Sequence, residues 1–377
     1  MSDVKLIKCE SYDNAENAMR ELLSDGLLDW VNPNMKIAIK VNLVTMANPN
    51  SAVTTHPALV TALVKILKEK NCEVIIGDSP GGLYNLAFLN AVYTAAGMKE
   101  CEAAGAVLNR NFNQRTVEFS EGKVAKEFLY TAFLDDCDAV IDFCKLKTHG
   151  MMGMSAAAKN MFGVIPGTIK PEYHFRYPNH DDFADMLIDL NEYVKPVLSI
   201  CDAVEAMEGN GPTKGKPRHI GVIAASLSPH KLDLVLADII GLDRLNVPTL
   251  NAAYKRGLIP ENVNELEIDG NISEFKVSDF DNIAGRKSIL FESSGFGGPI
   301  IGKFISLCLS SKPQLKPKMC VGCGECARIC PAKAIEMKNK KAVIDRELCI
   351  KCFCCQEFCP VGAMQTKRPF IAKLLNK

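Results

Sequence analysis

The sequence predicts an α/β protein: a layered domain with a mostly parallel sheet, followed by a small C-terminal α+β unit. Short apolar runs alternate with helical stretches through residues 1–285, which is the pattern of strand–helix–strand units. Residues 286–318 connect the two parts, and 305–318 hold two prolines and several lysines, as a linker does. The C-terminal unit spans 319–367 and is rich in cysteine, and a short basic tail occupies 368–377.

The predicted strands are short apolar runs bounded by polar residues or glycine. The first, KIAIKVNLV, has the composition of a buried strand, and the second, CEVIIG, ends in the turn DSPGG. The predicted strands span residues 36–44, 72–77, 139–145, 197–203 and 219–225, with short edge strands at 265–269 and 275–277.

The predicted helices lie between these strands. The first begins at Thr55-His56-Pro57, where Thr55 or His56 occupies the cap and Pro57 the first turn, a position at which the missing N–H costs nothing. Residues 181–193 have the spacing of an amphipathic helix. The predicted helices span residues 55–70, 83–98, 128–137, 181–193 and 232–240.

Polar residues follow the predicted strands, and in parallel sheets ligands bind just beyond the carboxyl ends of the strands. Each such residue also has a purely structural interpretation, because Asp and Ser cap helices and strand-end lysines are often solvated. The strand-end candidates are Lys40, Asn42, Asp78, Ser79, Lys145, Lys147, His149, Asp202, Glu205 and Glu208.

Lysines dominate this set. Lys145 and Lys147 point to the same side of an extended segment because strand side chains alternate with period two. Lys159-Asn160 follows SAAA, which suits the start of a helix. Lysines bind anions as point charges, and a buried lysine with a lowered pKa acts as an acid or base. We therefore expect a site for a small anionic, carboxylate-bearing molecule; the alternative is that these lysines only balance the acidic surface of residues 1–311.

The predicted site residues fall into two groups. The predicted catalytic residues are Lys145, Lys147, His149 and Lys159. The predicted substrate-binding residues are Lys40, Asn42, Asp78, Ser79, Asn160 and Asn210.

Two glycine-rich stretches are weaker signals. Met207–Pro217 is predicted to be a flexible loop that either holds an anion or is an ordinary surface loop. Gly297–Phe304 nearly matches the phosphate loop G-x-x-x-x-G-K-[ST], but it lacks the final Ser or Thr that binds magnesium. No G-x-G-x-x-G follows an early strand, so a dinucleotide fingerprint is absent from the sequence.

The C-terminal unit contains the pattern C-x₂-C-x₂-C-x₃-C-P twice, with an offset of 29 residues, at Cys320–Pro331 and Cys349–Pro360. This run holds [4Fe–4S] clusters in two-cluster bacterial ferredoxins, where the fourth cysteine ligates the other cluster. Zinc ribbons use pairs of cysteines with a long spacer, and neither they nor a disulfide framework produce triplets followed by Cys-Pro. We therefore expect two [4Fe–4S] clusters and a ferredoxin-like unit.

Crossed ligation assigns four cysteines to each cluster. Cluster one takes Cys320, Cys323, Cys326 and Cys359. Cluster two takes Cys349, Cys352, Cys355 and Cys330. The offset places Cys355 on Cys326 and Cys354 on Glu325, so Cys354 is expected to be a free thiol or a partner to the cluster shell instead of a ligand.

Composition narrows the classes of function. The residues MSDVKLIKCE have no long apolar run behind a basic start, so we expect no signal peptide, and no apolar run is long enough for us to expect a transmembrane helix. Sixteen cysteines without a secretion signal then favour the reducing cytoplasm. Residues 312–377 hold 14 Lys+Arg and 5 Asp+Glu, a balance of +9, which leaves −9 for residues 1–311. We interpret the basic unit as offsetting the anionic clusters and docking on the acidic domain with one cluster near the cleft, and not as binding nucleic acid.

Residues 1–285 resemble the DUF362 family, a domain of unknown function often fused to a two-cluster ferredoxin. The resemblance rests on KVNLV at 40–44, GDSPGG at 77–82, KLKTHGMMGMSAAAKNMFGVIPG at 145–167, DAVEAMEGNGPTKGKP at 202–217 and SPHKLDLVLADIIGLD at 228–243. The segment CIKCFCCQEFCP is similar to the second cluster motif of those fusions. The resemblance implies the fold class and a ferredoxin-type role, and it implies no particular reaction.

Three functions remain open from the sequence. The first is an iron–sulfur oxidoreductase, which passes single electrons between its clusters and a substrate in the α/β cleft. The second is a ferredoxin-like carrier whose large domain binds a redox partner protein. The third is a non-redox enzyme with structural clusters. Cluster reduction and reoxidation distinguish the three.

Overall fold

A nine-stranded sheet forms the centre of the large domain in this computed structural model, which describes residues 2–282 and 311–367. The strand order is β11-β1-β10-β9-β7-β2-β3-β4, and β8 pairs with β7. The first half of the chain supplies β1 (Val4–Lys8), β2 (Lys36–Val41), β3 (Glu73–Gly77), β4 (Val107–Leu108) and β7 (Ala139–His149). The remaining strands are β8 (Gly153–Ser155), β9 (Leu198–Glu208), β10 (Lys216–Ser226) and β11 (Ile268–Asp269).

The five strands β4, β3, β2, β7 and β9 run parallel to one another, whereas β10 is antiparallel to both β9 and β1. This confirms the predicted α/β class with a mostly parallel sheet. The buried β7 continues four residues beyond the predicted end at Lys145 and reaches His149. Its extra length carries Lys147 and His149 to the carboxyl edge of the sheet.

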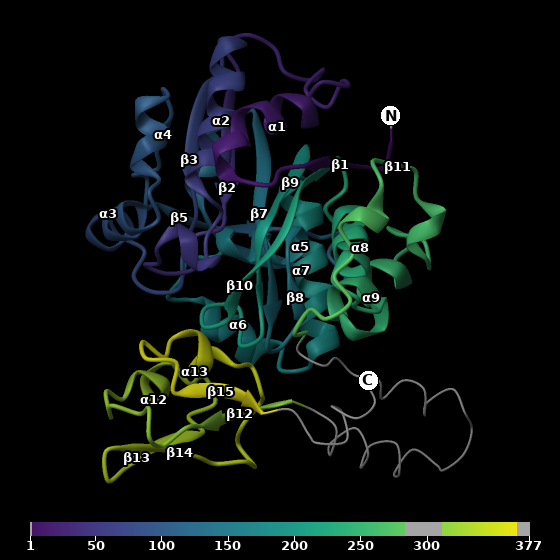
Figure 1. Cartoon of the computed structure of the whole chain (residues 1–377). Helices are drawn as coiled ribbons and strands as arrows, with labels where there is room; N and C mark the ends of the chain where they lie inside the picture. Colours follow the sequence, from purple (N-terminus) through teal and green to yellow (C-terminus); the bar gives the residue numbers. More distant parts are fainter. Residues whose placement is uncertain (1, 283–310, 368–377) are drawn as a thin grey trace.

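Helices cover both faces of the sheet (Figure 1). One face packs on α1 (Ala15–Leu22) and α2 (Pro57–Glu69), and α3 (Leu86–Ala95) and α4 (Lys99–Ala103) lie at the β3–β4 edge. The other face packs on α5 (Ala157–Asn160), α7 (His180–Val194), α8 (Pro229–Ile239) and α9 (Pro248–Lys255). His56 caps α2 by accepting from Ala58 N, and Pro57 is its first residue, as predicted. The short α6 (Lys170–Arg176) lies at the carboxyl edge of the sheet.

Several local predictions were wrong. Residues 128–137 were expected to be a helix, but they form β6 (Glu127–Thr131), which pairs with β5 (Gln114–Glu118), and a 3-10 turn at Ala132–Asp136. The expected strand at 275–277 has no strand partner. The alternative that Asp78 and Ser79 only cap the next helix is excluded, because Asn85 caps α3. The predicted loop at 207–217 is shortened by β9 and β10, which extend to Glu208 and from Lys216.

The C-terminal unit contains β12 (Lys312–Leu315), α12 (Glu325–Ile329), β13 (Ile335–Lys338), β14 (Lys341–Ile344), α13 (Cys354–Glu357) and β15 (Met364–Lys367). β12 pairs with β15 and β13 with β14, both antiparallel. The 29-residue offset maps β12 onto β14 and β13 onto β15 residue for residue. The repeat therefore begins at Lys312, so that residues 312–318 belong to this unit and not to the linker predicted at 286–318.

Two predicted features fall outside the described residues: the near-match to a phosphate loop at 297–304 and the basic tail at 368–377.

Candidate functional site

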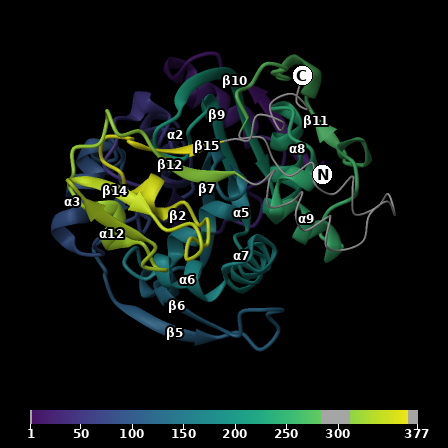
Figure 2. The same cartoon turned by 90° about the horizontal axis from the view of Figure 1, so that it is seen from below.

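The C-terminal unit covers the carboxyl ends of the central strands. Seen from below, it lies across the end of the sheet at β2 and β7 (Figure 2). Its buried Gln356 donates from Nε2 to Asn210 Oδ1 at 2.9 Å and to the Gly211 carbonyl at 3.0 Å. Asn210 Oδ1 also accepts from Thr366 N at 3.1 Å. Asn210, predicted to bind substrate, therefore joins the two parts of the protein.

Further contacts fix the unit in place. Lys214 Nζ donates to the Pro360 carbonyl at 3.0 Å, and Thr213 Oγ1 donates to the Glu357 carbonyl at 3.4 Å. A Cβ on Gly81 would lie 2.9 Å from Phe358 Cζ, so the Phe358 ring packs directly on that turn. The expected docking is present, and hydrogen bonds together with close packing hold the unit in place.

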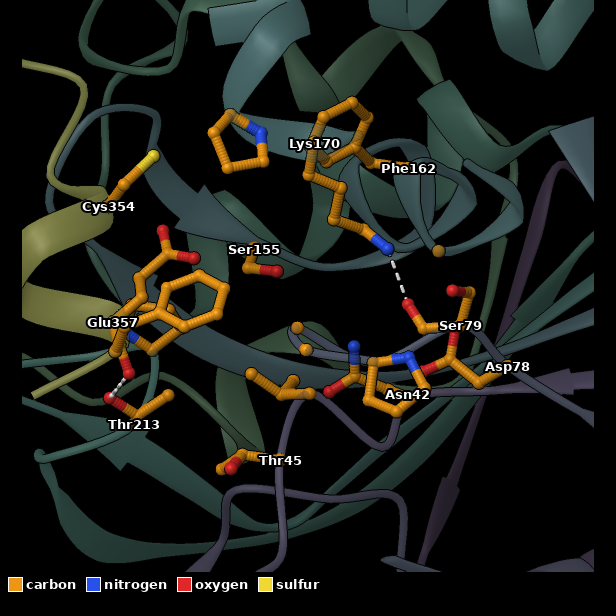
Figure 3. A pocket seen from close by; sticks show the side chains of 18 of the residues that line it. Asn42, Thr45, Asp78, Ser79, Ser155, Phe162, Lys170, Thr213, Cys354 and Glu357 are labelled. Carbon is orange, nitrogen blue, oxygen red and sulfur yellow. Dashed lines mark hydrogen bonds between the residues drawn. The ribbon is translucent and has the colours of Figure 1, made fainter. Parts of the chain in front are cut away.

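A cavity of about 560 Å³ lies between the two parts. This volume is within the range of small-molecule sites. Figure 3 shows Asn42, Asp78, Ser79 and Lys170 on one side, facing Cys354 and Glu357 of the C-terminal unit on the other. Most of the predicted cleft residues line it: Lys40, Asn42, Asp78, Ser79, Lys147, His149, Lys159 and Asn160.

Lys40 is the centre of a buried network at the bottom of the cavity. Its Nζ lies 2.9 Å from both Asp78 Oδ1 and Asn160 Oδ1, and it donates to the Val41 carbonyl at 2.8 Å. Asn160 Oδ1 also accepts from Asn42 Nδ2 at 2.8 Å. Two oxygens accept hydrogen bonds from this ammonium, and the Asp78 carboxylate balances its charge. Lys40 and Asp78 are therefore a charge-balanced pair that shapes the cavity.

Lys147 and Lys170 each have two hydrogen-bond acceptors among the described residues, which leaves one N–H of each ammonium for a ligand. Lys147 Nζ donates to Asn42 Oδ1 at 2.5 Å and to the Val53 carbonyl at 2.8 Å. Lys170 Nζ donates to the carbonyls of Ser79 and Ile165 (Figure 3). Burial lowers the pKa of Lys147 and of Lys170 to about 7. Both amines are thus poised between their charged and neutral forms near neutral pH.

Lys159 differs from the other lysines because its Nζ has no carboxylate partner or hydrogen-bond acceptor among the described residues. It lies 4.6 Å from the centre of the Phe162 ring and 6.0 Å from that of Phe183. Desolvation lowers its pKa, and Glu357 opposes this effect. An ammonium held on aromatic faces with its donors unused is available to bind an anion.

His149 and Glu357 bring the two parts of the protein together at the cavity. His149 Nδ1 accepts from the backbone N–H groups of Met151 and Met152, both at 3.2 Å, so the ring proton resides on Nε2. That Nε2 lies 3.2 Å from Glu357 Oε1. Burial lowers the pKa of His149. The pKa of Glu357 falls to about 2, because the interactions with His149 and Lys159 outweigh desolvation. A neutral imidazole therefore faces a carboxylate.

His174 also lines the cavity, and it stacks on Phe183 with ring centres 4.3 Å apart. Its buried Nδ1 has no hydrogen-bond partner among the described residues. Burial lowers the pKa of His174 to about 3, so the ring is neutral. It adds a polar group without adding charge.

Lys145 does not line the cavity, although the sequence placed it there. It is fully buried, and its Nζ lies 2.8 Å from Asp202 Oδ2 and 2.8 Å from the Tyr12 hydroxyl. Tyr12 in turn stacks on His56. The alternation rule predicted that Lys145 and Lys147 share a face, but the pairing of β7 with β9 is irregular between them and their amines reach different partners. Lys145 and Asp202 form a self-contained ion pair.

Glu205 and Glu208 also lie away from the cavity. Glu205 Oε1 lies 2.7 Å from His219 Nδ1, and Glu208 Oε2 accepts from Asp281 N at 3.1 Å. Neither strand-end carboxylate contributes to the cavity.

The motif cysteines separate into two groups in space. A small cavity is lined by Cys320, Cys323, Cys326 and Cys359, and a second by Cys330, Cys349, Cys352 and Cys355. Among the described residues, no three His, Cys, Asp or Glu side chains lie close enough to bind one metal ion. Four thiols spread around a common space suit the corners of a cubane better than a single ion. Both sets fit an iron–sulfur cluster.

Three lining residues escaped the sequence analysis. Lys170 follows a Gly-Thr-Ile turn with no motif to mark it, and His174 lies one helical turn further along α6. Glu357 lies between two motif cysteines, so a signal existed, but only the docking shows that the side chain faces the cavity. Cys354 lines the same cavity and lies outside both cysteine groups.

Comparison with known proteins agrees with this division of the chain. Residues 37–238 match the family described as "Domain of unknown function (DUF362)", and 312–360 match "4Fe-4S dicluster domain". The thylakoid-associated protein sll1697 of Synechocystis sp. is 31% identical over 271 residues, which cover 69% of this chain and 81% of that protein. Within residues 2–282 and 311–367, each helix is too short or too polar to cross a lipid bilayer.

One solved structure is also similar: the lactate racemase apoprotein from Thermoanaerobacterium thermosaccharolyticum. The identity is 13% and the TM-score 0.42, over 62% of this chain and 56% of that chain.

Proposed function

Because the chain belongs to the DUF362 family and carries a 4Fe-4S dicluster domain, we propose that it transfers electrons between two [4Fe–4S] clusters and a small anion bound in the interdomain cavity. The ferredoxin-type domain supports the electron-transfer role. The proposal of a substrate rests on the cavity, whose walls include Cys359 of one cysteine group together with lysines of the α/β domain.

The two spatial groups of cysteines support crossed ligation, with Cys359 joining Cys320, Cys323 and Cys326. When bound, such clusters accept and release single electrons. Cys359→Ser is expected to remove the spectroscopic signal of this cluster. The cluster held by Cys349, Cys352 and Cys355, whose motif contains Cys359, should stay intact. Loss of the cluster at Cys349, Cys352 and Cys355 instead would contradict the assignment.

Different side chains of the cavity bind the anion and exchange protons with it. Lys159 holds the anion, since its donors are unused within the described structure. Lys147 and Lys170 each offer one more N–H, and a pKa of about 7 makes either amine able to give up or take a proton. Docking of the C-terminal unit closes the site with Glu357 and Phe358 and brings Cys359 to its wall.

A carrier role is the second candidate. Cys323 is exposed and Val321 is 65% exposed, so one cysteine group is accessible from outside. This surface suits a redox partner protein. It is compatible with the first proposal, in which such a partner supplies or removes the electrons.

The test is an anaerobic titration of iron-loaded protein. About eight iron and eight sulfide ions per chain are expected from two clusters. After reduction by a one-electron donor, a small carboxylate should reoxidise the protein in a saturable way. Reoxidation only by a partner protein would favour the carrier, and four irons or fewer, stoichiometric zinc, or failure to reduce would overturn the electron-transfer proposal.

A further inference from the structure

The interdomain cavity has two chemically different ends. Its inner end consists of buried polar side chains, among them Lys40, Lys147 and His174. Its outer wall includes Met46 and Leu83, which are 53% and 58% exposed. The charged residues of that wall already have partners, since Arg328 pairs with Glu325 and Lys214 donates to the Pro360 carbonyl. A molecule that fills the cavity therefore places a polar group inside and an apolar group near the opening.

The inner end favours a single negative charge. Lys40 is neutralised by Asp78 at 2.9 Å. Lys147 and Lys170 already donate to two oxygens each, and their pKa of about 7 leaves them partly neutral. Glu357 contributes one negative charge on the opposite wall. The charges of Lys159 and Glu357 offset each other, so the net positive charge of the inner end comes from the partly charged Lys147 and Lys170 and stays small, which matches one carboxylate better than a group with several charges. Lys159 is the anchor for that carboxylate because its donors have no acceptor among the described residues.

The outer end is built from aromatic rings on a glycine turn. Phe358 packs on Gly81, and Phe88 packs on Gly82, where a Cβ would lie 2.6 Å from Phe88 Cζ. Both rings are partly exposed and line the cavity. Phe358 immediately precedes Cys359, so this apolar end lies on the cysteine side of the cavity. Rings at a cavity wall gain from contact with another flat apolar group.

We propose that the ligand is a monocarboxylate with an apolar group of at least phenyl size, bound with its carboxylate at Lys159 and its apolar group at Phe88 and Phe358. This inference rests on the proposed function, since it names the substrate class of the same cavity. This orientation places the apolar group on the side of the cavity that Cys359 lines.

Binding of non-reducible probes to iron-loaded protein tests the class independently of electron transfer. The probes are 3-phenylpropanoate, propanoate, 3-phenylpropanamide and succinate, each titrated by calorimetry under anaerobic conditions. We expect 3-phenylpropanoate to bind at least about tenfold more tightly than each of the other three, because only it satisfies both ends. Lys159→Met should abolish the difference in affinity between 3-phenylpropanoate and 3-phenylpropanamide. Lys99→Met, at an exposed position on α4, should leave this difference unchanged.

Phe88→Ala sharpens the test at the other end. This substitution should lower the affinity for 3-phenylpropanoate by about tenfold and leave the affinity for propanoate unchanged, because only the phenyl group reaches that wall. Tighter binding of succinate or propanoate than of 3-phenylpropanoate, or an unchanged affinity in Lys159→Met, would overturn the inference. The proposed function would survive those results if another anion reoxidised the clusters. Conversely, the expected binding pattern without reoxidation by any small molecule would support the ligand class and refute the proposed function.

Discussion

Lys145 and Lys159 are both largely buried lysines near the carboxyl ends of the sheet, yet their surroundings differ completely. Lys145 has a carboxylate and a hydroxyl within 2.8 Å, whereas Lys159 lies against aromatic faces, feels the Glu357 charge only at a distance, and has no ion-pair or hydrogen-bond contact among the described residues. A buried charge with all its donors satisfied is part of the scaffold. A buried charge with unused donors is available for a ligand. The completeness of hydrogen bonding, and not the position on a strand, separates the two roles.

The largest expected effect follows from breaking the completed pair. Lys145→Met leaves Asp202 buried without its cation, which should lower the free energy of unfolding by about 3–5 kcal/mol. Denaturant unfolding of the iron-loaded protein measures this loss. Lys145→Met/Asp202→Leu is the control, since removal of both charges should recover most of the stability. A loss below about 1 kcal/mol would show that Lys145 is not held as described.

The interface should respond less strongly. Asn210→Ala removes the acceptor shared by Gln356 Nε2 and Thr366 N, which should weaken docking by about 1–3 kcal/mol. Hydrogen exchange at the amides of β15 measures the loosening. Asn113→Ala, at an exposed position directly before β5 and away from the interface, is the matched control. Equal protection in both variants would argue that packing at Gly81 and Phe358 alone holds the unit.

The pH dependence of anion binding is a third expectation. Without a ligand, Lys147 and Lys170 have a pKa of about 7, below the usual 10.5. A bound carboxylate raises these pKa values, so above pH 7 the bound state holds more protons than the free state. The affinity for 3-phenylpropanoate should therefore be level below pH 6 and fall above pH 7, by up to about tenfold per pH unit for each lysine. Calorimetry from pH 6 to 9 checks the direction, and an affinity that rises with pH would contradict it.

The smallest expected effect is on the stability of Lys159→Met. No ion pair or hydrogen bond among the described residues is lost, and the cation–π contacts contribute about 1 kcal/mol or less. The free energy of unfolding without a ligand should thus change by no more than that amount. A loss as large as that of Lys145→Met would reveal a structural partner for Lys159 and remove the contrast between the two lysines.

The sequence predicted the chemistry of the cysteines better than that of the cleft. The doubled cysteine motif has fixed spacing, so its ligands follow from local pattern, and the two spatial groups agree with that assignment. The parallel sheet and its carboxyl edge also followed from strand–helix alternation. Both depend on information that is local in sequence.

The errors concern partners that are distant in sequence. Nothing around Lys145 indicates that Asp202 and Tyr12 would complete its hydrogen bonds, at separations of 57 and 133 residues. Likewise, only the docked structure shows that Asn210 belongs to the interface and that Glu357 lines the cavity. No sequence motif marks Lys170, because its place at the cavity depends on two backbone carbonyls that only the tertiary structure brings near it.

The most direct test of the central claim is the rate at which a small carboxylate reoxidises reduced, fully iron-loaded protein, compared between Lys159→Met and Lys99→Met. If the interdomain cavity is where substrate and clusters meet, Lys159→Met should lose at least about tenfold in this rate at subsaturating substrate, with unchanged iron content. Lys99→Met should behave as the parent protein. Equal rates in the two variants, for a carboxylate that reoxidises the parent, would contradict the claim that electrons are exchanged in this cavity.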